Sequence, residues 1–149
     1  ALLPLVRGQG HRRRALSIVN DVGVPVASLP DFIEDVEAIF GRLGLEAAIY
    51  GHAGSGNLHL RLFFDADSPD LKQLLERVAG EVYKAVFHYN GTITAEHGMG
   101  RLRAPFLKEE WGERVYGYMR RVKRIFDPDN LFNPEAMFSN RPVTDLLKY

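Results

Sequence analysis

The stretch that decides the fold is Asn57-Leu58-His59-Leu60-Arg61-Leu62-Phe63-Phe64. Two rows of side chains alternate along it. One row is Leu58, Leu60, Leu62 and Phe64, and the other is Asn57, His59, Arg61 and Phe63. Successive side chains of a β-strand point to opposite faces of a sheet. The stretch therefore predicts a strand whose leucine-rich row packs on helices, while the row that carries His59 faces a ligand or a partner.

The segments on either side of this strand alternate between strand and helix patterns. Runs of β-branched apolar residues predict strands, and apolar residues three and four positions apart predict helices with one buried stripe. The stripe of the last helix is Trp111, Val115, Met119, Val122 and Ile125. In chain order we expect a strand over 15–22, a helix over 32–43, a strand over 45–50, the strand over 57–64, a helix from about 69 to 89, a short strand over 92–95 and a helix from about 109 that stops at 127–130.

The order strand, helix, strand, strand, helix, strand is that of the ferredoxin-like fold. We therefore predict an α+β domain with an antiparallel sheet, helices on one face, an added C-terminal helix and an extended tail. The 149 residues amount to one domain, in which we expect 1–14 and 135–149 to be irregular. Because the chain lacks an initiator methionine, we interpret it as a fragment of a larger protein.

Composition excludes several classes of function. The 19 basic and 19 acidic residues leave no net charge, which argues against a nucleic-acid-binding protein. No cysteine is present, so this chain supplies no disulfide, thiolate zinc site or iron–sulfur ligand. No apolar run reaches the length of a transmembrane segment. We therefore look for function in the polar residues of the loops.

Two glycine-rich segments, 51–59 and 94–101, hold three of the five histidines. His52 and His59 flank a turn, so their imidazoles converge if the flanks form a hairpin. Glu96, at the end of the predicted short strand, is then a third ligand for Zn²⁺, Mn²⁺ or Fe²⁺. His97 remains as a base for a substrate proton. The alternative is that His52 and His59 only hydrogen-bond the backbone of the turn.

These segments, together with 20–25 and 126–134, resemble the C-terminal domain of FAD-linked oxidases of the vanillyl-alcohol oxidase superfamily. That superfamily includes the flavin-linked subunit of glycolate oxidase, D-lactate dehydrogenase and D-2-hydroxyglutarate dehydrogenase. The spaced patterns GHxGxGNxH and EHGxGR carry the resemblance, which covers nearly the whole chain after Arg14. It implies a cap domain that supplies the substrate site of a flavin-dependent enzyme oxidising a small D-2-hydroxyacid such as D-lactate or glycolate.

The resemblance also implies roles for individual residues. His52, His59 and Glu96 match metal ligands, and His97 matches the histidine that acts as base beside the flavin. Asn133 matches a residue near the flavin, and we expect Gly98 and Gly100 to contact this cofactor as well. FAD itself would be bound mainly by an upstream FAD-binding domain. We therefore expect this chain alone to be inactive.

The chain departs from the family pattern at a few positions. Ser55 stands where Asp is common, Glu135 where Gly is common, and the segment before Asp21 lacks a Lys that some hydroxyglutarate enzymes use for substrate. Residues 103–107 and 141–149 look most like the large members of the family, which implies an iron–sulfur electron-transfer domain or subunit as a partner. We expect a cytoplasmic location, with peripheral attachment to the cytoplasmic membrane left open. The rival interpretations are a non-catalytic metal- or ligand-binding module and a structural cap without chemistry.

Overall fold

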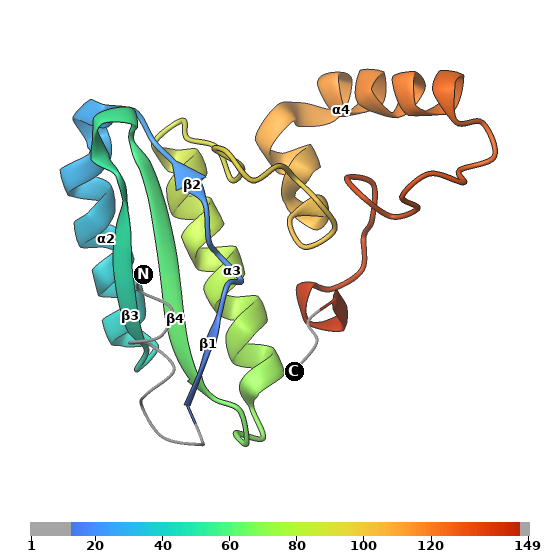
Figure 1. Ribbon diagram of the computed structural model, residues 1–149. Helices are drawn as coiled ribbons and strands as arrows, with labels where there is room; N and C mark the ends of the chain where they lie inside the picture. Colours follow the sequence, from blue (N-terminus) through green and yellow to red (C-terminus); the bar gives the residue numbers. More distant parts are fainter. Residues whose placement is uncertain (1–12, 147–149) are drawn as a thin grey trace.

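The computed structural model describes residues 13–146, so most of the N-terminal segment that we expected to be irregular lies outside the described residues. Strand β4 (Asn57–Asp65) lies at the centre of the sheet and pairs antiparallel with every other strand. Strand β3 (Glu46–His52) runs along one of its edges. Strands β1 (Arg13–Leu16) and β2 (Val22–Gly23) lie end to end along the other edge (Figure 1).

Helices α2 (Leu29–Arg42) and α3 (Leu71–His88) cover one face of this sheet (Figure 1). The leucine-rich row of β4 is buried against them, as its alternation predicts. The antiparallel sheet with helices on one face confirms the predicted α+β class. None of the helices in the described part of the chain is long and apolar enough to cross a membrane. The core combines residues of both helices with this row, among them Phe32, Val36, Leu60, Leu62, Leu75, Val78 and Val82.

The first predicted strand, 15–22, is wrong as a continuous element. The structure breaks it at residues 17–21, between β1 and β2, and Asp21 there has a left-handed backbone with φ of +68°. Arg13 and Arg14 belong to β1 and not to an irregular segment. The predicted strand over 92–95 is reduced to one bridge, in which Gly23 and Thr92 exchange backbone hydrogen bonds of 2.8 and 2.7 Å. This bridge still places the segment beside β2, where a ferredoxin-like fold has its last strand.

Helix α4 (Leu107–Phe126) follows a short 3₁₀ turn, Ala104–Phe106, and bends at Gly112. Gly112 has φ 73° and ψ 163°, which is not helical. Figure 1 accordingly shows α4 as two pieces with different axes. The prediction that its apolar stripe is buried is wrong at three positions: Trp111, Val122 and Ile125 are exposed. The bend carries the second piece of the helix away from the sheet.

The C-terminal segment returns to the core. Asp127 ends α4 by accepting hydrogen bonds from the backbone N–H groups of Leu131 and Phe132, at 2.8 and 3.0 Å. The prediction of an irregular tail over 135–149 is wrong at Val143–Leu146, which forms a 3₁₀ helix, η4, beside α3, and residues 147–149 of this prediction lie outside the described residues. Thr144 donates a hydrogen bond of 2.7 Å to Glu76 of α3.

The loop between β3 and β4 contains a position, Gly56, at which the backbone conformation and a close contact require glycine. Gly56 has φ of +71°, and a Cβ atom there would lie 1.9 Å from the Val24 carbonyl oxygen. Gly54, in the same loop, has open space around it. We predict that Gly56→Ala lowers the free energy of unfolding by about 2 kcal/mol or more, whereas Gly54→Ala changes it by less than about 0.5 kcal/mol. Urea unfolding followed by circular dichroism measures both, and equal effects would contradict the prediction.

Candidate metal and acid–base site

The hairpin places two histidines on one face of the sheet. Tyr50 pairs with His59 across the two strands, and His52 lies two residues beyond Tyr50 on the same side of β3. The rings of His52 and His59 have centroids 5.8 Å apart. His59 is buried in the middle of this face, while the His52 side chain is 64% exposed at the end of its strand. The two imidazoles thus come from adjacent strands, facing the same space.

Glu96 and His97 reach the same space from the loop after the Gly23–Thr92 bridge. The Glu96 Oε1 atom lies 3.1 Å from Nε2 of His59, 3.3 Å from Nε2 of His97 and 3.8 Å from Nε2 of His52. The rings of His59 and His97 stack with their centroids 5.2 Å apart. The structure therefore brings together all four residues that the sequence singled out as metal ligands or base. We call His52, His59, Glu96 and His97 the histidine–glutamate cluster.

The donor atoms of this cluster fit a divalent metal. Ligands held about 2.1 Å from one metal ion lie roughly 3.0–3.4 Å from each other in tetrahedral or octahedral arrangements. The separations of Glu96 Oε1 from Nε2 of His59 and of His97, 3.1 and 3.3 Å, lie in that range, whereas the separation from His52 Nε2, 3.8 Å, is longer. Imidazole with carboxylate suits Zn²⁺, Mn²⁺ or Fe²⁺. By distance His97 is a better third ligand than His52, because it lies 3.3 and not 3.8 Å from Glu96 Oε1 and joins His59 and Glu96 in a group of ligand atoms within 4.8 Å of one another that does not include His52.

Asp21 is the residue that sequence reasoning missed. Its side chain is fully buried, and one of its oxygen atoms lies within 4.8 Å of ligand atoms of His59, Glu96 and His97. Its carboxylate accepts hydrogen bonds from the backbone N–H groups of Glu96, at 3.1 and 3.2 Å, and of His97, at 2.8 Å. The available signal was a carboxylate inside the predicted strand 15–22, where a strand would bury it.

The residues predicted to contact a cofactor lie outside this cluster. Gly98 and Gly100 follow His97 in the same loop, have left-handed backbones with φ of +74° and +62°, and are exposed. Asn133 is exposed in the C-terminal segment, which contacts the loop through a hydrogen bond of 2.7 Å from the Met137 N–H to the Gly100 carbonyl.

Arg61 adds a positive charge on the face that carries His59. It lies two residues beyond His59 in β4 and is half-buried. Its guanidinium donates a hydrogen bond to Ser17 Oγ, in the break between β1 and β2. A guanidinium has five N–H donors, so this bond leaves others for a carboxylate. The face thus combines the cluster with a group that suits an anion.

Comparison with known proteins shows the family of the chain. Residues 1–137 match the sequence model of the family described as FAD linked oxidases, C-terminal domain, and the chain belongs to this family. It is 30% identical over 128 residues to the GlcD subunit of glycolate oxidase from Bacillus subtilis, an alignment that covers 86% of this chain and 27% of that protein.

Two further relatives carry other names. The chain is 31% identical over 121 residues to D-2-hydroxyglutarate dehydrogenase of Escherichia coli, covering 81% of this chain and 12% of that protein. It is 31% identical over 123 residues to the mitochondrial D-lactate dehydrogenase (cytochrome) of Kluyveromyces lactis, covering 83% of this chain and 21% of that protein. The chain thus spans well under a third of the length of these relatives.

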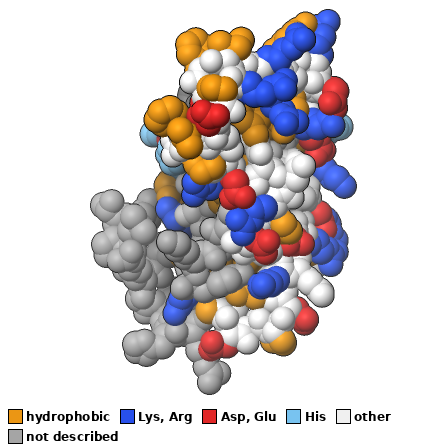
Figure 2. Space-filling model, turned by 90° about the vertical axis from the view of Figure 1, so that its right-hand side faces the viewer, with side chains coloured by type: hydrophobic (Ala, Val, Ile, Leu, Met, Phe, Trp, Pro, Cys, Tyr) orange, Lys and Arg blue, Asp and Glu red, His pale blue; other side chains and the backbone are white. Residues whose placement is uncertain are grey.

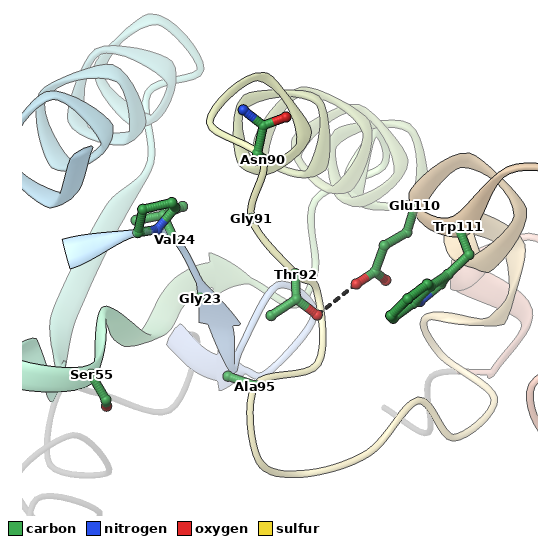
Figure 3. Close-up of a pocket in the computed structure, with 10 residues that line it drawn as sticks. Gly23, Val24, Ser55, Asn90, Gly91, Thr92, Ala95, Glu110 and Trp111 are labelled. Carbon is green, nitrogen blue, oxygen red and sulfur yellow. Dashed lines mark hydrogen bonds between the residues drawn. The ribbon is translucent and has the colours of Figure 1, made fainter. Parts of the chain in front are cut away.

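A hollow of about 550 Å³ lies between β2, the 90–95 segment and the start of α4. Figure 3 shows Glu110 and Trp111 at one side of it, with Thr92 donating a hydrogen bond of 2.6 Å to Glu110 Oε1. The members of the histidine–glutamate cluster do not line this hollow, although Ala95 does. Burial raises the pKa of the Glu110 carboxyl above its ordinary value, against the opposing effect of the Thr92 hydrogen bond.

This raised pKa predicts a pH dependence of stability. Below the ordinary pKa of 4.5 the carboxyl is protonated in the folded and unfolded chains alike. As the pH rises, the unfolded chain ionises first, so the contribution of Glu110 to stability falls until the pH passes the pKa of the folded state. We predict that Glu110→Gln gains stability relative to wild type as the pH increases above about 4.5. Thermal unfolding from pH 4 to 8 measures this, and a difference that does not vary with pH would contradict it.

Proposed function

We propose that this chain is the substrate-binding and cap domain of a flavin-dependent oxidoreductase that oxidises a D-2-hydroxyacid. The observation that carries the proposal is the convergence of three imidazoles on one carboxylate oxygen. Family membership supports it, because two relatives are named as dehydrogenases and one as an oxidase subunit of hydroxyacids. The complete protein is then an enzyme, and the smaller acids D-lactate and glycolate are the substrates to test first.

In this proposal His52, His59 and Glu96 hold a divalent metal, and His97 is the base. The metal, when bound, lowers the pKa of the substrate hydroxyl and orients it. His97 Nε2 accepts the hydroxyl proton, and Arg61 attracts the carboxylate of the acid to the same face of the sheet. FAD would supply the two-electron oxidant, as acceptor of the hydride from C2, so that the substrate would leave as a 2-keto acid. A ligand set of His59, Glu96 and His97 is the alternative, and the shorter distance of His97 from Glu96 favours it.

The FAD-binding part of the protein lies, in this proposal, in the upstream polypeptide of its longer relatives. An exposed apolar face supports it: Ile125 is 74% and Phe126 81% exposed, and Leu131 and Phe132 follow. Figure 2 shows hydrophobic side chains gathered beside Lys and Arg side chains at the end of the molecule where α4 lies. Contiguous exposed apolar patches mark interaction sites. The flavin would then lie between that domain and the loop with Gly98 and Gly100, and Asn133 would approach it from the C-terminal segment.

Two parts of the proposal rest on the sequence resemblance alone. An iron–sulfur domain or subunit would accept electrons from the reduced flavin, as the similarity of residues 103–107 to large family members implies. A cytoplasmic location, with peripheral attachment to the membrane left open, also stays a prediction.

The first test concerns the isolated chain. We predict that the purified 149-residue chain oxidises no D-2-hydroxyacid and binds FAD weakly, because no segment offers a dinucleotide cradle of the Rossmann or P-loop type. Equilibrium dialysis with FAD and a dye-linked oxidation assay measure this. A stoichiometric yellow cofactor on the purified chain would place the flavin site within these residues.

The second test separates base from metal ligand in the full-length enzyme. We predict that His97→Asn lowers flavin reduction by a D-2-hydroxyacid on the order of 10²–10⁴-fold while leaving metal content nearly intact. Glu96→Gln should lower metal content and flavin reduction together. Stopped-flow absorbance gives the rate, and elemental analysis gives the metal. His88→Asn, at the C-terminal end of α3, is the matched control and should change neither.

Other outcomes would change the assignment. Loss of metal in His97→Asn but not in His52→Asn would make His97 a ligand in place of His52. Near-normal flavin reduction in His97→Asn would remove it as the base. Metal bound by wild type, with no reduction of flavin by any 2-hydroxyacid, would favour a non-catalytic binding module.

A further inference from the structure

Glu96 and His97 lie in a segment that makes few backbone hydrogen bonds to the sheet. The Gly23–Thr92 bridge is its one strand-like pairing within residues 13–146, and Gly98 and Gly100 follow with left-handed backbones. A functional site needs side chains fixed within about 0.5 Å. Some other interaction must therefore hold the backbone at these two residues.

Asp21 provides that interaction. Three consecutive N–H groups of the segment bond to this one residue: Ala95 donates to its carbonyl at 3.3 Å, and Glu96 and His97 donate to its carboxylate. Successive N–H groups that converge on an anion form a favourable nest. Charge-assisted hydrogen bonds of this kind are roughly twice as strong as neutral ones. The carboxylate thus accepts hydrogen bonds from N–H groups that a neighbouring β-strand would otherwise bond.

Arg103 contacts both the segment that carries Asp21 and the loop that follows His97. One guanidinium nitrogen donates to the Gly98 carbonyl at 2.6 Å, and the other donates to the Asn20 carbonyl at 2.7 Å and lies 3.8 Å from Asp21 Oδ2. Arg103 and Asp21 are both buried. The arginine therefore joins the residue before Asp21 to the residue after His97. Removing one partner of a buried ion pair leaves the other charge uncompensated, so the two act as a unit.

We propose that Asp21, held by Arg103, is a positioning residue that sets the geometry of Glu96 and His97. The proposal rests on the function proposed for the cluster and adds a residue that acts through hydrogen bonds to the backbone N–H groups of Glu96 and His97. Asp21 holds the backbone at both functional residues and at Ala95 before them. Its loss therefore displaces both side chains together. Outer-shell partners of metal ligands typically change metal affinity by about 10–100-fold.

The experiment uses the full-length protein with Asp21→Asn, because asparagine keeps the shape but loses the charge. Histidine-selective labelling and NMR on the metal-free protein detect the contact between the stacked rings of His59 and His97. Titration with Co²⁺ gives an affinity and a visible absorption spectrum. We expect Asp21→Asn to lose the ring contact, to bind Co²⁺ at least about tenfold more weakly and to change the spectrum.

Val36→Ala is the control, since Val36 is fully buried in α2 and its truncation destabilises the core without touching the loop. It should lower the melting temperature but keep the ring contact and the Co²⁺ affinity. Arg103→Lys is the second variant if Asp21→Asn does not fold, because one ammonium cannot reproduce the two-sided contact. It should weaken Co²⁺ binding severalfold and lose the ring contact.

Persistence of the ring contact in Asp21→Asn and Arg103→Lys, or a Co²⁺ affinity of these two variants within twofold of wild type, would overturn the proposal. Failure of the wild type to bind Co²⁺ would overturn the proposed metal site instead. In that case the ring contact still decides whether Asp21 positions His97.

Discussion

The register of β4 is the constraint on which the rest of the structure depends. This strand pairs with every other strand, and its side chains divide strictly between a core face and a site face. A slip of one residue would move His59 into the core and Leu58 or Leu60 out of it. The pairing of Tyr50 with His59 then fixes the position of His52, which lies two residues further along β3 on the same face. Burial of four apolar side chains on one face thereby determines the position of an imidazole on the other.

The elements that local pattern controls were predictable from sequence. Alternation located β4, and helical spacing located α2 and α3, because in each case one buried face dominates the choice of residues. The convergence of His52 and His59 followed from the hairpin. The predicted elements were wrong where tertiary contacts override the local preference of the sequence. The break at 17–21 exists because Asp21 turns to hold another segment, and no pattern within 15–22 encodes that partner.

The prediction of a buried apolar stripe on α4 was wrong for a different reason. Its apolar positions have correct helical spacing, but spacing says only that a stripe exists and not what covers it. Gly112 turns the helix, so Val122 and Ile125 at the far end of the stripe are exposed, whereas Met119 still packs against the core. In the same way Arg103 gives no sequence signal of its role, because its partners at 20, 21 and 98 are distant in sequence or are backbone carbonyls.

The bend at Gly112 also has a consequence for folding. The second piece of α4 exposes Val122, Ile125 and Phe126 and buries its other apolar side chains only in part, so packing within residues 13–146 stabilises it weakly. Helical stability in proteins comes mainly from packing of an apolar face. The free energy that keeps this piece ordered must therefore come largely from whatever covers that face. Local opening of α4, measured by hydrogen exchange, is consequently coupled to the presence of a neighbouring surface, whereas α2 and α3 are protected by the core of the domain itself.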